Sequence, residues 1–309
     1  MKGIPHRHRP LLVYAEVWWA AWTVPIHLER GEDMTASLSR RVLAEFLGTA
    51  LLVLFGAGSV VAALEVGGGR LDYAGLGIVA LAFGLVVALV IYCLGTTSGA
   101  HINPAVTLSL AAARRFSWVE VPAYVVAQLA GALVGALLIV AFVGDRATDL
   151  GGVGLTALAS GVTVAQGMVA EALGTFLLVF TIMAVAVDKR APAGWAGFLI
   201  GLAVAVQIMV IGPFTGGSVN PARSFGPYLA NALFGGSTPW ADSWVYVIGP
   251  VFGGALAAIS YDLLARPEAE VPPVGEPAET ATRSGVLAAD TPSKPVTPTE
   301  TTPKPGRGS

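Results

Sequence analysis

Residues 98–107 read SGAHINPAVT and residues 217–224 read GSVNPARS, so the tripeptide Asn-Pro-Ala occurs twice. Each copy follows a long apolar run. Asparagine is a favoured N-cap and proline is favoured at the first helical position, so Asn103-Pro104-Ala105 and Asn220-Pro221-Ala222 each predict the start of a helix. Beside a membrane span, such a start points the positive end of its dipole into the membrane. Two facing starts would form a narrow polar site, where each asparagine leaves its side-chain NH2 free to donate.

The composition indicates a membrane protein. The chain of 309 residues is 54% hydrophobic and only 12% charged, with a mean hydropathy of +0.70. Soluble domains contain about 25% charged residues. A span needs about 20 mainly apolar residues. The six stretches that meet this requirement are 42–63, 74–94, 119–143, 164–187, 195–213 and 243–264.

Two shorter apolar segments, 104–114 and 221–233, follow the Asn-Pro-Ala tripeptides. They reach only about halfway across a bilayer, which is expected of re-entrant half-helices. The alternative is a pair of surface loops with amphipathic helices, but residues 102–113 contain no charge. The predicted fold is an all-α membrane protein with six transmembrane helices and two re-entrant half-helices.

The charged residues predict the orientation of the chain. In a six-span arrangement the basic residues of one side outnumber Arg70 and Arg146 on the other, and the positive-inside rule then places both termini in the cytoplasm. The basic residues of that side are Arg40, Arg41, Arg114, Arg115, Lys189, Arg190 and Arg266.

Several classes of function are disfavoured. The formal net charge of −2 is too small to indicate a nucleic-acid partner. The single cysteine, Cys93, excludes an intramolecular disulfide, and no Cys/His cluster has the spacing of a metal site. The spans offer no nucleophile–base pair and no phosphate-binding glycine loop. We therefore expect neither an enzyme nor a bound cofactor or metal.

The chain contains an internal repeat. Residues 44–49 read AEFLGT and residues 170–175 read AEALGT, and each is followed two segments later by an Asn-Pro-Ala tripeptide. Three spans separate equivalent points, so the two halves, about 42–143 and 164–264, have opposite orientations. This inversion would bring the two half-helix starts together at the midplane.

With these motifs the sequence closely resembles the aquaporin, or major intrinsic protein, family over about residues 40–265, and it looks like a bacterial or archaeal-type water channel with a non-standard filter. The resemblance implies a channel domain at 34–266 with a passive pore in each protomer. It also implies a homotetramer in the lipid bilayer of the inner (plasma) membrane.

In channels of this family four positions form a constriction, and they fall here on Phe83, Ile208, Gly217 and Arg223. The position of Arg223 is fixed because it directly follows the second tripeptide. The alternative for an intramembrane arginine is a structural ion pair. Phe83 and Ile208 are placed by counting along helices, so each could instead be a core or lipid-facing residue.

This quartet departs from the pattern of strict water channels, which resembles it but has histidine in place of Ile208. With Ile208 and Gly217 we expect a wider and less polar opening. Glycerol facilitators usually have tryptophan at Phe83 and aspartate at Ser224. Ser224 and Tyr246 favour the aquaporin branch, whereas Val247 fits neither branch. We expect a channel for water that also admits small uncharged solutes such as glycerol, or dissolved gases.

The expected mechanism is passive. Carbonyls of the non-helical approaches 95–102 and 212–219 would accept hydrogen bonds from water in single file. Asn103 and Asn220 would each donate to one central water, which breaks the chain of donors that a proton would follow. The positive helix ends would repel cations, hydronium included.

Glu45 and Glu171 have two interpretations. They could relay protons in a proton-coupled secondary transporter, whose inverted repeats and broken helices look alike in sequence. We favour structural support, in which each carboxylate accepts backbone N–H groups of the segment before a half-helix. His101 is either a cytoplasmic pH gate or a polar residue at the inner mouth, and we favour the latter.

The flanking segments lie outside the repeat. Residues 267–309 hold nine of the twenty prolines and predict a disordered cytoplasmic tail, in which serine and threonine could be phosphorylated. Residues 1–33 contain the apolar run 11–26, which superficially resembles a signal peptide or an extra span. Met34 lies just ahead of Arg40, and we expect the true start there.

Overall fold

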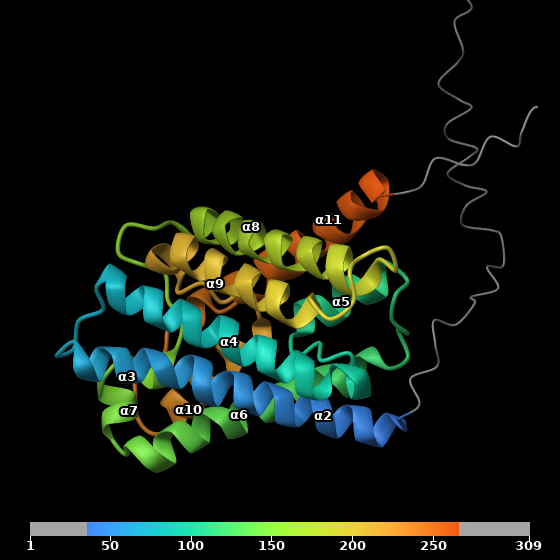
Figure 1. The fold of residues 1–309 in the computed structure, drawn as a ribbon. Coiled ribbons are helices and arrows are strands. Elements are labelled where there is room, and N and C mark those ends of the chain that lie inside the picture. The colour runs from blue at the N-terminus through green and yellow to red at the C-terminus, as the bar shows by residue number, and fades with distance from the viewer. Residues whose placement is uncertain (1–35, 266–309) are drawn as a thin grey trace, which may run out of the picture. The chain divides into compact units, whose positions relative to one another are not determined.

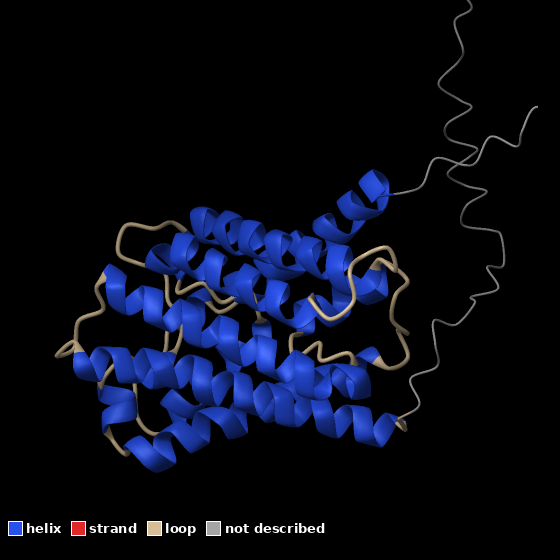
Figure 2. Ribbon diagram, viewed as in Figure 1, coloured by secondary structure: helices blue, strands red, loops and turns tan. Residues whose placement is uncertain are grey.

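The computed structural model describes residues 36–265, which form helices and loops with no strand among them (Figures 1 and 2). The predicted extension 1–33, the start at Met34 and the tail 267–309 lie outside the described residues.

Six helical spans are long and apolar enough to cross a membrane. The prediction of six spans is therefore confirmed, with ends that differ by up to four residues. The first span consists of α2 (Leu38–Leu51), the π-helical η1 (Leu52–Ala57) and α3 (Gly58–Val66); the others are α4 (Tyr73–Ser98), α6 (Val121–Val143), α8 (Val164–Ile182) with η3 (Met183–Val187), α9 (Ala196–Thr215) and α11 (Val245–Ala265).

Two short helices, α5 (Pro104–Ala112) and α10 (Pro221–Leu233), follow the tripeptides. They contain 9 and 13 residues, so at 1.5 Å per residue they are about 14 and 20 Å long, well short of the roughly 30 Å of a bilayer core. Helix α5 packs against α11, and α10 packs against α6. Each short helix therefore has a long helix as its support. The remaining short elements are α7 (Arg146–Asp149), η2 (Gly152–Gly154) and η4 (Trp240–Asp242).

The two halves meet where α4 crosses α9, and the two helices run side by side in Figure 1. A Cβ atom on Gly84 would lie 2.6 Å from the carbonyl oxygen of Gly201, and one on Gly201 would lie 2.3 Å from that of Gly84. These two glycines also occupy equivalent positions, 19 residues before Asn103 and Asn220 respectively. Helices α4 and α9 therefore approach each other at equivalent positions of the two repeats.

Helices α4 and α9 end at equivalent glycines. Gly99 and Gly216 have φ of 85° and 82°, a left-handed conformation that glycine adopts without a steric penalty. Their amides donate to the carbonyls of Gly95 and Gly212. The non-helical approaches are therefore 99–102 and 216–219, and the predicted longer ranges 95–102 and 212–219 are wrong. Each helix continues until a residue adopts the left-handed conformation that caps it. Gly95 and Gly212 still lie within the helices.

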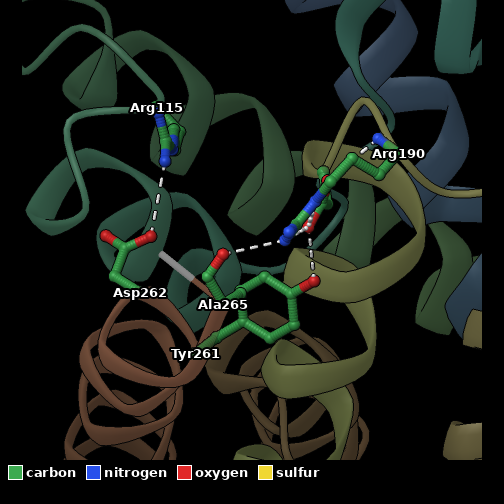
Figure 3. A network of polar contacts seen from close by, with 6 residues as sticks. Arg115, Arg190, Tyr261, Asp262 and Ala265 are labelled. Carbon is green, nitrogen blue, oxygen red and sulfur yellow. Dashed lines mark hydrogen bonds and ion pairs between the residues drawn. The ribbon is translucent and has the colours of Figure 1, made fainter. Parts of the chain in front are cut away.

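Hydrogen bonds connect the loop that joins η3 to α9 with the end of α11 (Figure 3). The Tyr261 hydroxyl donates to Asp188 at 2.8 Å, and Arg190 donates to the Ala265 carbonyl at 2.9 Å. The hydrogen-bonded Arg190 guanidinium holds the pKa of the Asp188 carboxyl well below its usual range. Because the pKa of Asp188 is lowered in the folded state, its ion pair with Arg190 is present at neutral pH. This ion pair is lost only when the pH falls through that low value. Nearby, Arg115 forms an ion pair with Asp262.

Candidate functional site

The starts of α5 and α10 are capped in the same way. Asn103 Oδ1 accepts a hydrogen bond from the Ala105 amide at 2.8 Å, and Asn220 Oδ1 accepts from the Ala222 amide at 3.0 Å. Pro104 and Pro221 occupy the first helical position, which needs no N–H donor. Local sequence alone therefore accounts for where both helices begin.

Each asparagine also binds the backbone of the opposite repeat. Asn103 Nδ2 donates to the Val219 carbonyl at 2.8 Å, and Asn220 Nδ2 donates to the Ile102 carbonyl at 2.9 Å. The expectation that each NH2 is left wholly free is thus corrected, because the tips of the two short helices are close enough to bond each other. A carboxamide nitrogen carries two hydrogens, so each asparagine keeps one for another acceptor.

The two residues whose carbonyls accept these hydrogen bonds have strained backbone. Ile102 and Val219 have φ of 42° and 49°, values that are unfavourable for β-branched residues and cost about 1–3 kcal/mol each. Such strain persists only where the surroundings determine the conformation. In this conformation the carbonyls of Ile102 and Val219 point toward the asparagine of the other repeat.

Buried carboxylates satisfy the amides of these segments. Glu45 accepts hydrogen bonds from the amides of His101 at 2.9 Å and Ile102 at 2.6 Å. Glu171 accepts from the amides of Ser218 at 3.0 Å and Val219 at 2.7 Å. Further donors to Glu45 are the Ser98 hydroxyl and the Gln128 amide, and the Thr215 hydroxyl donates to Glu171. Both side chains are fully buried, so each carboxylate replaces the water that these backbone groups lack.

The starts of α5 and α10 meet at a junction, where Asn103 and Asn220 each bond the opposite repeat. One cavity of about 360 Å³ lies beside this junction. Both asparagines and the four expected filter residues line it. The residues in question are Phe83, Asn103, Ile208, Gly217, Asn220 and Arg223. The two carboxylates are not among its lining residues and lie behind its wall.

Arg223 is held at two points. Its Nη1 donates to the Gly154 carbonyl at 2.8 Å, and its guanidinium carbon lies 4.7 Å from the centroid of the Phe83 ring. Its buried Nε has no hydrogen-bond partner among the described residues. A guanidinium carries five N–H donors, so Arg223 keeps donors beyond the one that binds Gly154.

The segment that anchors Arg223 was not predicted from the sequence. Residues 151–154 read GGVG, and all four have φ between 58° and 92°. A Cβ atom on Gly154 would lie 2.3 Å from the Ala57 carbonyl oxygen. The density of glycines is the signal that could have indicated a tightly bent loop. Similarly, Gly56 leaves room for the Phe83 ring, which would lie 2.4 Å from a Cβ atom there.

The other residues considered from the sequence have varied positions. His101 lines the cavity, with Nδ1 3.2 Å from the Thr107 hydroxyl and its ring against Phe116. The Tyr246 hydroxyl donates to the Thr215 carbonyl at 2.9 Å. Val247, which fitted neither branch, is 48% exposed on α11 and does not line the cavity.

A comparison with known proteins agrees with this geometry. The family model for Major intrinsic protein matches residues 32–261. The chain belongs to the major intrinsic protein family. It is therefore a multi-pass protein of a family of membrane channels.

Relatives within the family support this assignment. Aquaporin AqpM of Methanothermobacter marburgensis is 46% identical over 241 residues, which cover 74% of this chain and 98% of that protein. Aquaporin TIP4-4 of Zea mays is 44% identical over 233 residues, covering 75% and 88%. The X-ray structure of the aquaglyceroporin from Plasmodium falciparum has a TM-score of 0.67 at 24% identity, with 74% of this chain and 97% of that chain covered, and shows the shared fold.

The anchor of Arg223 can be tested with Gly154→Ala. The new methyl group would collide with the Ala57 carbonyl and displace the carbonyl that holds Arg223. Gly68→Ala is a matched control, because Gly68 also has a positive φ, of 60°, but nothing lies within 4 Å of its Cβ position. We expect Gly154→Ala to lower the free energy of unfolding by about 1–3 kcal/mol more than the control does. Equal thermal stability of the two variants in detergent would contradict the anchoring role.

Proposed function

We propose that the chain forms a passive channel for water that also admits small uncharged solutes, such as glycerol and dissolved gases, and excludes protons and other ions. The observation that carries this proposal is the meeting of two asparagine-capped helix starts beside one cavity, with one amide hydrogen of each asparagine still available. Among residues 36–265, no group of three or more His, Cys, Asp or Glu side chains could hold a metal ion.

The two asparagines act on a water molecule as paired donors. A central water oxygen accepts from Asn103 and from Asn220, so its own hydrogens point away along the cavity in both directions. No chain of hydrogen bonds of one polarity then crosses the centre. The partial positive charges at the starts of α5 and α10 add an electrostatic barrier to hydronium and other cations.

The filter sets the width and polarity of the path. Arg223 supplies a fixed positive charge and guanidinium N–H donors, so it repels cations and donates to a passing oxygen. Ile208 presents a hydrocarbon wall, and Gly217 adds almost no volume. This combination supports a wider and more apolar opening than a filter with histidine at Ile208, and hence the passage of solutes larger than water.

Glu45 and Glu171 act in this proposal as structural supports rather than as proton relays. Both oxygens of each carboxylate already accept at least one hydrogen bond. A relay would have to break these bonds and leave backbone N–H groups unpaired in the membrane, at a cost of several kcal/mol for each group. The proton-coupled transporter is the outcome that the flux experiment below would reveal instead.

We further propose a homotetramer in the plasma membrane, with both termini in the cytoplasm. Large apolar side chains such as Phe55, Leu85 and Phe252 are more than half exposed in the single chain, as expected for surfaces that meet lipid or another protomer. Each protomer would contain its own pore, since the cavity is built from one chain.

Passive conduction predicts a specific pair of fluxes. Reconstituted protein should accelerate the osmotic shrinkage of vesicles, while the proton permeability of those vesicles stays at the lipid background. Stopped-flow light scattering measures the first quantity, and a pH-sensitive dye inside the vesicles measures the second. A proton or sodium current, or uptake that requires an ion gradient, would reject the channel in favour of a transporter.

The width of the filter is tested with Ile208→His. The imidazole adds a polar group and narrows the opening across from Phe83. We expect glycerol permeability to fall more than water permeability, because the larger solute is the one excluded by the lost width. Ile208→Leu, which keeps the volume and the apolar wall, serves as the control and should leave the ratio unchanged. Equal losses of both permeabilities in Ile208→His would place this residue outside the filter.

A further inference from the structure

Gly56 lies against the expected filter residue Phe83 without lining the cavity itself. It belongs to the π-helical turn η1 of the first span, which packs against α4, the helix that carries Phe83. Leu52, four residues earlier, lines the cavity. Residues four apart lie on one face of a helix, so Gly56 lies on the side of η1 that is turned toward the cavity. Gly56 is nevertheless buried and is not among the lining residues.

The ring of Phe83 occupies the space that a side chain at residue 56 would need. A Cβ atom on Gly56 would lie 2.4 Å from Cε1, 2.5 Å from Cδ1 and 2.9 Å from Cζ of that ring. The optimal separation of two carbon atoms is about 3.5–4.0 Å. Because an aromatic ring is rigid, a methyl group at residue 56 would displace the whole ring rather than one flexible end.

The place of this ring affects the filter. Phe83 lines the cavity, and the guanidinium carbon of Arg223 lies 4.7 Å from its ring centroid. Phe83 is only 4% exposed, so most of its surface is in contact with close-packed protein, which leaves little room for a shifted ring. The empty space beside it is the cavity. A ring pushed away from Gly56 would therefore move toward the cavity and narrow it.

The second repeat fills the equivalent place in another way. Counted from the repeated glutamates, Gly56 corresponds to Ile182, and counted from the two asparagines, Phe83 corresponds to Ile200. Both isoleucines line the cavity. One repeat thus uses two aliphatic side chains, whereas the other uses one large ring and no second side chain. The repeated scaffold does not demand a glycine here, so Gly56 matches the ring of the expected filter.

We propose that Gly56 is a positioning residue of the filter, because the absence of a side chain there keeps the Phe83 ring back from the cavity. This inference rests on the proposed channel function and names what sets the largest solute that passes. Gly56 touches no solute and acts only through Phe83. Its effect on permeability should therefore depend on the presence of the ring.

The test introduces Gly56→Ala into two backgrounds and measures both fluxes by stopped-flow light scattering. With Phe83 present, the ratio of glycerol to water permeability should fall by about tenfold or more, the discrimination that one methyl group can produce in a closed pocket. In the Phe83→Val background, which lacks all three contacting carbons, Gly56→Ala should leave the ratio unchanged. Gly58→Ala is the matched control, because Gly58 is buried in the same span and the nearest atom would lie 3.6 Å from its Cβ atom. Its ratio should match that of the wild type.

The outcomes separate this inference from the channel proposal. Absence of water flux in the wild type would reject the channel itself. An equal fall of the ratio in both backgrounds, or no fall in either, would reject only the role of Gly56. If the wild type passes water but no glycerol, water permeability is compared instead, and Gly56→Ala should lower it only where Phe83 is present. If Gly56→Ala does not fold, adding Phe83→Val should restore folding, and a double variant that also fails to fold would overturn the proposal.

Discussion

The rest of the structure depends on how the four-residue segments 99–102 and 216–219 satisfy their backbone inside the membrane. Lipid offers no hydrogen bonds, so non-helical backbone at membrane depth is tolerated only where protein or a water-filled cavity satisfies it. Glu45 and Glu171 accept the buried amides, and Asn103 and Asn220 bond one carbonyl each across the two repeats. These contacts satisfy the backbone between each long helix and the short helix that follows it.

The proposed filter lies around the second of these junctions. Gly217 lies within the segment that Glu171 holds, and Arg223 lies in the first turn of the helix that Asn220 caps. Gly154 and Phe83 then fix the guanidinium from the other side. The two repeats share the junction but not the proposed filter, because the positions that correspond to Gly217 and Arg223 in the first half are Ala100 and Val106. The residues that the repeats share therefore build the scaffold, and residues that differ between the repeats line the proposed filter.

The sequence was sufficient for the architecture because the strongest signals were local. Long apolar runs predicted the spans, and Asn-Pro-Ala predicted both helix starts, since capping depends on adjacent residues. The ends of α4 and α9 were placed too early: the predicted non-helical approaches begin at Gly95 and Gly212, whereas the left-handed caps are Gly99 and Gly216. The partners of the asparagine amides and the Gly154 anchor depend on contacts between residues far apart in the chain, which periodicity and composition do not encode.

The central claim is that Asn103 and Asn220 each use one amide hydrogen to join the repeats and offer the other to a single water. An experimental structure in lipid, at a resolution that shows ordered water, tests this claim most directly. The account predicts one water oxygen within hydrogen-bonding distance of both Nδ2 atoms, with the bonds to Val219 and Ile102 intact. A cation at that point, or asparagine side chains turned away from each other's repeat, would contradict it.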